Sequence, residues 1–157
     1  MSQTHNTAPE YWFYHMESSS LKAVLPELLE KTLERGWTAL VKTSEAELAE
    51  LDTFLWTYRE DAFLPHGRDD EPLADSHPVK LSAHASAAEG ADIVFITDGS
   101  EMSDLTVVSR LIYMINGQSE TAVTQARKHW SETKASGAAM SYWQQDGRGK
   151  WIKKAST

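Results

Sequence analysis

Two residues near the carboxyl end of the chain have side chains suited to recognising a carboxylate joined to an apolar group. Arg127 and Trp130 are three positions apart, so on a helix they would be neighbours on one face. A guanidinium can hold a carboxylate through two hydrogen bonds, and an indole beside it can wall an apolar pocket. Taken alone, a core Trp130 beside a solvated Arg127 is the better interpretation, but the spacing does not decide between the two, so both stay open at this point.

Other polar residues give weaker indications of chemistry. His66 follows Pro65 in a predicted loop, where an imidazole can serve as an acid or base, but a structural or surface role is the better interpretation of a lone histidine. The carboxylates between positions 69 and 75 could ligate a hard cation, although a solvated loop explains them more simply. Ser18 to Ser20 lack the flanking glycines of a nucleophile elbow. None of these residues specifies an active site or a metal site.

The glycine pattern argues against a nucleotide site. A dinucleotide-binding Gly-x-Gly-x-x-Gly should follow the first predicted strand, but the segment from His15 to Ser20 contains no glycine. Gly147, Gly149 and Lys150 do not have the spacing of a phosphate-binding loop. We therefore predict no catalysis and no cofactor. A small α/β nucleotide-binding or hydrolytic enzyme is the alternative.

Composition narrows the class of protein. The chain has 157 residues, 41% of them hydrophobic, which suffices for one domain with a real core. Its net charge of −8 would repel the phosphates of DNA, although a local basic patch could still bind an acidic peptide. The chain has no cysteine and no apolar run long enough to cross a membrane, and its first ten residues are polar. These features favour a cytoplasmic protein.

Periodicity predicts strands that alternate with helices, and hence an α/β fold with a mainly parallel sheet. The helices should run from Leu21 to Leu33, from Ser44 to Leu55 and from Glu120 to Ser136. Serines precede each of them as N-caps, Ser44 with Glu47 as a capping box, and Gly36 and Gly137 end two of them. Pro26 should kink the first helix or mark its first turn. The strands are expected at 11–16, 37–43, 79–83, 92–98 and 110–116.

The remaining segments are predicted as connections. Surface loops are expected at 68–77 and 84–90, and a short helix or turn at 104–109. The segment after Gly137 is either a terminal hairpin or one strand with a tail. Residues 1–10 are predicted to be a disordered lead-in, and 11–154 to be the single domain.

One connector, from Leu51 to Gly67, is unusually aromatic. Trp56, Tyr58 and Phe63 fall within eight positions, just after the helical leucines. Three large rings in so short a stretch either fill the core or form a platform for a partner.

The chain resembles the DNA polymerase III chi subunit family. The likeness covers 11–154, and its most specific part is the block from Leu55 to His66. The residues that carry it are Tyr14, Gly36, Leu51-Asp52, Leu55-Trp56, Phe63-Leu64-Pro65-His66, Pro78-Val79, Ala126-Arg127, Gly137 and Tyr142-Trp143-Gln144.

The resemblance implies a Rossmann-like, three-layer domain that uses no nucleotide. It implies a non-catalytic accessory subunit of the bacterial clamp-loader assembly, acting in DNA replication at the replisome in the cytoplasm. The implied partners are the psi subunit and the acidic, Phe-ended C-terminal tail of single-stranded-DNA-binding protein. DNA would be reached only indirectly, and in some members a helicase uses the psi surface.

The resemblance also assigns residues to these partners. Trp56 and Phe63 fall at the psi-docking positions. Arg127 matches the arginine that engages the tail carboxylate, with Trp130 at the aromatic position beside it and Asn116 and Lys128 nearby.

The chain departs from the family pattern on this last helix. Val123 and Ser131 stand where a family member has lysines, and Asn116 replaces an apolar pocket residue. Lys128, Lys134 and Arg110 are the candidates to compensate for the missing charge.

Overall fold

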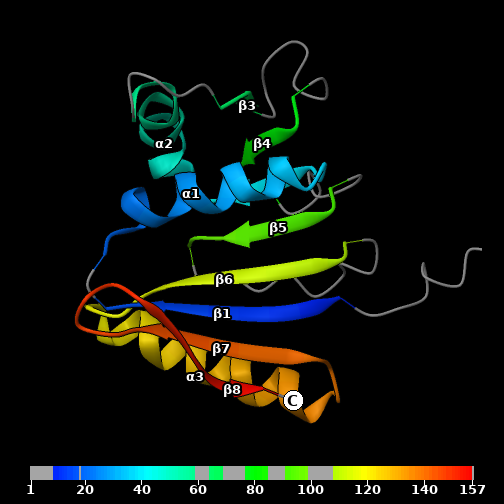
Figure 1. The fold of residues 1–157 in the computed structure, drawn as a ribbon, viewed down its shortest axis with the longest axis vertical. Helices are drawn as coiled ribbons and strands as arrows, with labels where there is room; N and C mark the ends of the chain where they lie inside the picture. The colour runs from blue at the N-terminus through cyan, green and yellow to red at the C-terminus, as the bar shows by residue number, and fades with distance from the viewer. Residues whose placement is uncertain are drawn as a thin grey trace, which may run out of the picture.

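The computed structural model describes residues 9–17, 19–58, 64–68, 77–84, 91–98 and 108–156. Within them, helices and strands alternate through most of the chain (Figure 1). In chain order the elements are β1 (Glu10–Met16), α1 (Leu21–Glu34), β2 (Ala39–Lys42), α2 (Glu45–Thr57), β3 (His66–Arg68), β4 (Val79–Ser82), β5 (Ile93–Ile96), β6 (Arg110–Asn116), α3 (Glu120–Ala135), β7 (Met140–Gln145) and β8 (Trp151–Ser156).

The strands form one open sheet in the order β3-β4-β2-β5-β6-β1-β7-β8. Each neighbouring pair is parallel except β7 and β8, which run antiparallel. Strand β1 is internal, paired with β6 on one side and β7 on the other. The predicted α/β class with a mainly parallel sheet is confirmed.

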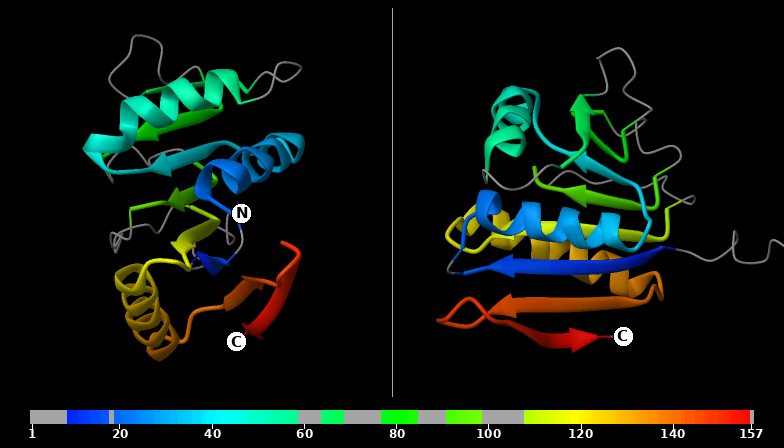
Figure 2. Two further views of the ribbon diagram at one scale, coloured as in Figure 1. Left: turned by 90° about the vertical axis from the view of Figure 1, so that its left-hand side faces the viewer. Right: turned by 45° about the horizontal axis from the view of Figure 1, so that its top comes forward.

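Helices cover both faces of the sheet, which gives the predicted three layers (Figure 2). Leu25 and Leu29 of α1 pack with Leu51 and Leu55 of α2 in the core on one face. On the other face, Ala126 of α3 packs with a buried cluster that contains Phe13. Alternation along β1 sends Tyr14 to the first core and Phe13 to the second.

The serines begin the helices as predicted, with one difference. The hydroxyls of Ser20 and Ser119 accept hydrogen bonds from backbone N–H groups in the first turns of α1 and α3. Ser44 precedes α2, but its hydroxyl donates to the Glu47 carboxylate at 3.1 Å and makes no bond to the backbone. The predicted capping box is therefore wrong. The hydroxyl bonds to the carboxylate that should have reached back to the Ser44 backbone.

The predictions for Pro26 and for the glycines at the helix ends are also tested. Pro26 lies inside α1, in its second turn and not its first, so the carbonyl of Lys22 lacks the usual N–H partner there. Gly36 follows the helix with a φ of 77°, a conformation that residues with a side chain rarely adopt. The same holds for Gly137 after α3, at 81°.

The sheet contains one strand that the sequence did not predict. Residues His66 to Arg68 form the edge strand β3, paired in parallel with β4, where a loop was expected from Arg68 onward. A three-residue strand without apolar alternation gives no period-2 signal. The chain after Gly137 forms the β7–β8 hairpin, which decides between the two predicted alternatives.

Several predicted segments lie outside the described residues: 1–8, 69–76, 85–90 and 99–107, together with Phe63. Val108 and Ser109 are described and are not helical. Within the described part of the chain, none of the helices combines the length and the apolarity needed to cross a bilayer.

Candidate functional site

Helix α3 presents Arg127 and Trp130 toward the side chain of Tyr142 on β7. The Trp130 ring is half-buried, edge-on to Phe13 at 5.3 Å and to Tyr142 at 5.5 Å between ring centroids. Arg127, one turn earlier, is exposed. Trp130 is thus part of the α3-side core and also borders the surface that carries Arg127. Trp130 is therefore partly core and Arg127 is solvated, and carboxylate binding by this pair stays a prediction.

The pKa of Tyr142 reports the charge on this surface. Burial raises the pKa of the Tyr142 hydroxyl above its ordinary value, and the negative charge of Glu17 raises it further. The positive charge of Arg127 opposes both. The guanidinium of Arg127 therefore acts on the same small region as the rings of Trp130 and Tyr142. An arginine placed in this way can pair with a carboxylate that arrives from solution.

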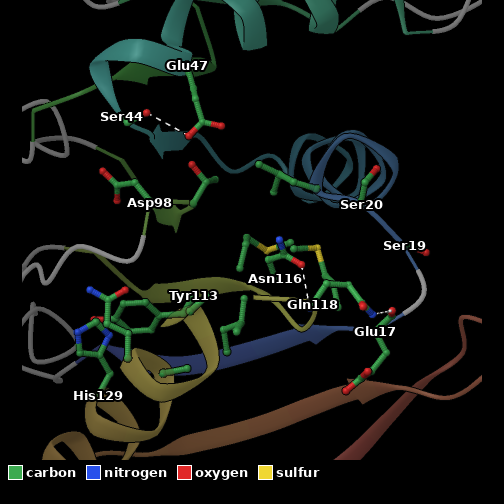
Figure 3. A pocket seen from close by; sticks show the side chains of 18 residues that line it. Glu17, Ser19, Ser20, Ser44, Glu47, Asp98, Tyr113, Asn116, Gln118 and His129 are labelled. Atoms are coloured by element: carbon green, nitrogen blue, oxygen red, sulfur yellow. Dashed lines mark hydrogen bonds between the residues drawn. The ribbon is translucent and has the colours of Figure 1, made fainter. Parts of the chain in front are cut away.

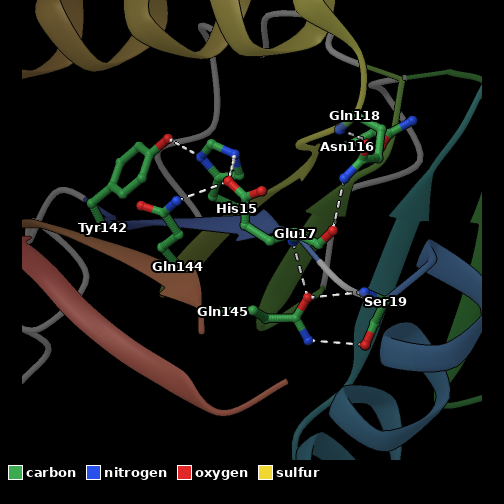
Figure 4. Close-up of polar contacts among 8 residues, drawn as sticks. All are labelled: His15, Glu17, Ser19, Asn116, Gln118, Tyr142, Gln144 and Gln145. Carbon is green, nitrogen blue, oxygen red and sulfur yellow. Dashed lines mark hydrogen bonds and ion pairs between the residues drawn. The ribbon is translucent and has the colours of Figure 1, made fainter. Parts of the chain in front are cut away.

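A polar network continues from Tyr142 to the carboxyl end of β1 (Figure 4). The Tyr142 hydroxyl lies 2.8 Å from Nδ1 of His15, and Nε2 of His15 lies 2.9 Å from Oε1 of Glu17. The side-chain amides of Gln144 and Gln118 donate to the Glu17 carboxylate and to its backbone carbonyl, respectively. These bonds hold His15 and Tyr142 in place. They join the α3 surface to the end of the sheet.

A pocket of about 830 Å³ lies beyond the carboxyl ends of β1, β5 and β6 (Figure 3). Here α1 leaves β1 toward one face of the sheet, and α3 leaves the neighbouring β6 toward the other. Ligands of open α/β sheets bind at such a switch point. Gly117 fits closely at the end of β6, since a Cβ there would come within 2.5 Å of the Met16 carbonyl oxygen.

The charges around this pocket do not suit a nucleotide. Three carboxylates line it, from Glu17, Glu47 and Asp98, and the described residues of the lining include no lysine or arginine. Asp98 is paired with the buried Lys42, whose Nζ lies 2.7 Å from Oδ2. Phosphates would meet negative charge here, which weighs against the alternative of a nucleotide-binding enzyme.

The structure separates the residues assigned to the tail surface. Asn116 lines the strand-end pocket, where its Oδ1 accepts from the backbone N–H of Gln118 at 3.0 Å. Arg127 and Trp130 do not line that pocket. Lys128 is exposed beside Arg127 on α3. Arg110 lies on the opposite face of the sheet, with its guanidinium 3.9 Å from the centre of the Trp12 ring, so it cannot replace a charge next to Arg127.

The aromatic connector divides into buried and exposed residues. Leu51 and Leu55 are buried in the core. Trp56 is 47% exposed, with its ring 4.2 Å from the imidazole of His66. The prediction for Phe63 lies outside the described residues.

His66 has a structural role, as the sequence suggested. It is fully buried, with Nδ1 2.7 Å from the carbonyl oxygen of Leu64 and Nε2 3.2 Å from that of Asp52. These contacts join β3 to α2. Elsewhere in the described residues, no three acidic or histidine side chains are grouped to hold a metal ion.

Sequence reasoning missed the network of His15, Glu17, Tyr142 and Gln144. Its bonds join residues up to 127 positions apart, and no spacing motif marks them. The available signal was polarity after aromatic runs: β7 finishes in Gln144 and Gln145, and the aromatic run of β1 is followed by His15 and, just past the strand, by Glu17. That signal becomes useful only once β1 and β7 are known to be neighbours.

Fold and site together define a doubly wound α/β protein without a phosphate-binding glycine loop. Comparison with known proteins then identifies its family. The model of the family described as "DNA polymerase III chi subunit, HolC" matches residues 9–141, and the chain belongs to this family.

A curated relative agrees with this assignment. The "Probable DNA polymerase III subunit chi" of Rickettsia prowazekii (strain Madrid E) is 25% identical over 105 residues. The matched region is 66% of this chain and 63% of the relative, less than two thirds of the relative's length. Strand β8 lies beyond the part of the chain that the family model matches.

Proposed function

We propose that this protein is a non-catalytic adaptor subunit of the DNA polymerase III clamp-loader assembly. It bridges the psi subunit to the acidic C-terminal tail of single-stranded-DNA-binding protein and works at the replisome in the cytoplasm. Family membership supports the polymerase context. The acidic strand-end pocket supports an adaptor over a nucleotide enzyme. A clear, saturable thermal stabilisation by a nucleotide would overturn this choice.

The observation that carries the tail-binding part is the exposed Arg127 beside the half-buried ring of Trp130. A tail that ends in phenylalanine offers a carboxylate for the guanidinium and a ring for the aromatic wall of Trp130 and Tyr142. Lys128 and Lys134, both exposed on α3, can attract the acidic residues that precede the tail's end. Val123 is partly buried against the core and adds no charge.

The interface proposed here is small. One arginine and one aromatic pocket give a weak contact, of the size of transient encounters. Single-stranded DNA coated by many copies of the binding protein presents many tails, and their multiplicity raises the effective concentration at the site.

The tail proposal is tested by combining a protein variant with a peptide variant. Arg127→Ala should weaken the binding of an acidic, Phe-ended peptide by about 1.5–3 kcal/mol, because the guanidinium contacts a charged group of the peptide. Amidation of the peptide's terminus should weaken its binding to wild type by a similar amount. It should weaken binding to Arg127→Ala little further, since both changes remove the same contact. Fluorescence polarisation measures all four affinities, with Lys31→Ala, which removes an exposed lysine from α1, as the charge control. Equal affinities for wild type and Arg127→Ala would overturn the assignment.

The psi-docking proposal rests on Trp56. Trp56 and Ile152 are the two exposed large hydrophobic residues of the described chain, at 47% and 39%. Aromatic residues in this setting are frequent binding hot spots. We expect Trp56→Ala to abolish co-purification with psi while Ile152→Ala retains it, both with unchanged thermal unfolding. Retention of psi by Trp56→Ala would mean that the docking site does not depend on Trp56. Unfolding of the variant would mean that the ring is part of the core. Phe63→Ala is the companion variant.

A further inference from the structure

Cations and indole rings alternate across the sheet on the side of α1 and α2. The guanidinium of Arg35 lies 4.5 Å from the Trp37 ring centre, and that of Arg110 lies 5.4 Å from the same ring and 3.9 Å from Trp12. The series then continues toward the hairpin: the Trp12 and Trp143 rings are 5.7 Å apart, and Nζ of Lys153 lies 5.4 Å from the Trp143 ring. We call these six residues the indole–cation track.

The order of the strands makes the track continuous. Trp37 precedes β2, and the next members lie on β6, β1, β7 and β8, in the order of the sheet. The register places Trp143 opposite Tyr14 of β1 on one side and Lys153 of β8 on the other. In Figure 1, β6 and β1 are seen directly, with α1 above them and α3 behind. β8 crosses in front of β7, and no described helix crosses this part of the face. Trp12, Trp37 and Trp143 are each partly exposed and also pack against the core on this face, and Nε1 of Trp12 is buried.

The hairpin adds local positive charge to an acidic protein. From Met140 to Thr157 the chain carries four cations, namely Arg148, Lys150, Lys153 and Lys154, and one carboxylate side chain, that of Asp146. The other 139 residues therefore carry a net charge of −11. The overall charge of −8 conceals this asymmetry, which is the kind that marks a polyanion-binding surface.

We propose that the indole–cation track binds single-stranded nucleic acid. Each nucleotide brings a planar base and a phosphate, which correspond to the alternating rings and cations of the track. An acidic peptide would use the cations but would leave most of the rings without a partner, so the nucleic acid fits the whole surface better. Glu10, which pairs with Arg110 at 3.1 Å, reduces the charge in the middle of the track and leaves Arg35 and Lys153 as the cations at its two ends.

This inference is independent of the tail-binding proposal, because Trp12, Trp37 and Trp143 pack against the core on one face of the sheet and α3 packs against the core on the other. It also revises the expectation that the net charge would keep the protein off DNA. Binding would be weak and salt-dependent, since a few local cations act against the charge of the whole chain.

The test is fluorescence polarisation at low salt with labelled oligothymidylate longer than the roughly 4–16 nucleotides that one binding domain covers. Wild type should bind, and Trp143→Ala should weaken binding about tenfold, in line with the loss of one stacked base. Trp143→Phe, which keeps a ring, should recover most of the loss. Lys153→Ala should also reduce the slope of log K against log salt by about 0.7.

Two controls separate the track from other surfaces. Lys134→Ala removes an exposed lysine from the end of α3, and Trp56→Ala removes an exposed indole from α2. Both should bind oligothymidylate like wild type. Should Trp143→Ala unfold, the exposed Lys153→Glu carries the test alone.

Three results would overturn the proposal. The first is no binding of oligothymidylate by wild type at low salt. The second is equal binding by wild type, Trp143→Ala and Lys153→Glu. The third is an acidic peptide that binds the track when oligothymidylate does not, which would assign the surface to a protein partner.

Discussion

Strand β1 presents aromatic residues on both of its faces, and the two faces differ in what covers them. On the α3 side, Phe13 is stacked on Tyr113 at 5.0 Å and on Tyr142 at 6.1 Å, with Trp130 of α3 above it. It is fully buried. On the other side, Trp12 keeps partial exposure and has the guanidinium of Arg110 over its ring.

The difference teaches how aromatic runs should be interpreted. Both faces have large rings at similar spacing, because side chains alternate along one strand. On one face a helix covers Phe13 and makes it core. On the other face Tyr14 is also core, with Trp151 stacked on it, whereas Trp12 has a cation over its ring. What covers each ring therefore decides whether it is core. The composition of the strand does not.

The largest expected effect on stability is that of Phe13→Ala, which tests the comparison of the two faces. Removing a fully buried ring leaves a cavity, so we expect a loss of about 3–5 kcal/mol in the free energy of unfolding. Trp143→Ala removes a larger side chain that is only partly buried and should cost clearly less. Urea unfolding of both variants measures the contrast. Equal losses would mean that the track is as much core as the α3 side is.

A second, smaller effect concerns the alkaline stability of the protein. Burial raises the pKa of Tyr14 from 10.0 to about 12, opposed in part by the charge of Arg110. The unfolded chain therefore loses this proton first as pH rises. Stability should be complete below pH 10 and should fall by about 2–3 kcal/mol as pH passes through 12.

Unfolding in urea over this pH range tests the effect, with Tyr14→Phe as the variant that lacks the titrating group and should lose less stability. The Trp151 ring is stacked on Tyr14 at 4.8 Å, so Trp151→Ala should lower the pKa of Tyr14 toward 10. Titration of Tyr14 near 10 in wild type would show instead that β8 leaves this face open to water.

The helices were the predictable part of this fold. Ser20 and Ser119 mark two helix starts, Gly36 and Gly137 mark two ends, and leucines at helical spacing identify the buried sides. Short-range physics determines these features, so a single sequence carries them. The same reasoning failed for Ser44, because its hydroxyl bonds to the Glu47 carboxylate and not to a backbone N–H group.

The site was only partly predictable. Arg127 and Trp130 could be found because a helix brings residues three apart together. The track could not, since its six residues come from positions 12, 35, 37, 110, 143 and 153, and only the order of the strands makes them neighbours. β3 escaped prediction for a different reason, because three residues are too few to show a strand period.

The smallest expected effect is the change in stability caused by Lys153→Ala, a residue of the track. Lys153 is exposed on the edge strand β8, and a surface substitution of this kind changes the free energy of unfolding by about 0.5 kcal/mol or less. Lys153→Ala should therefore unfold in urea almost like wild type, whereas Phe13→Ala should not. A loss near that of Phe13→Ala would show that the Lys153 contact with the Trp143 ring stabilises the fold. A small loss, together with weakened oligothymidylate binding, would mean that this residue contributes to recognition and little to folding.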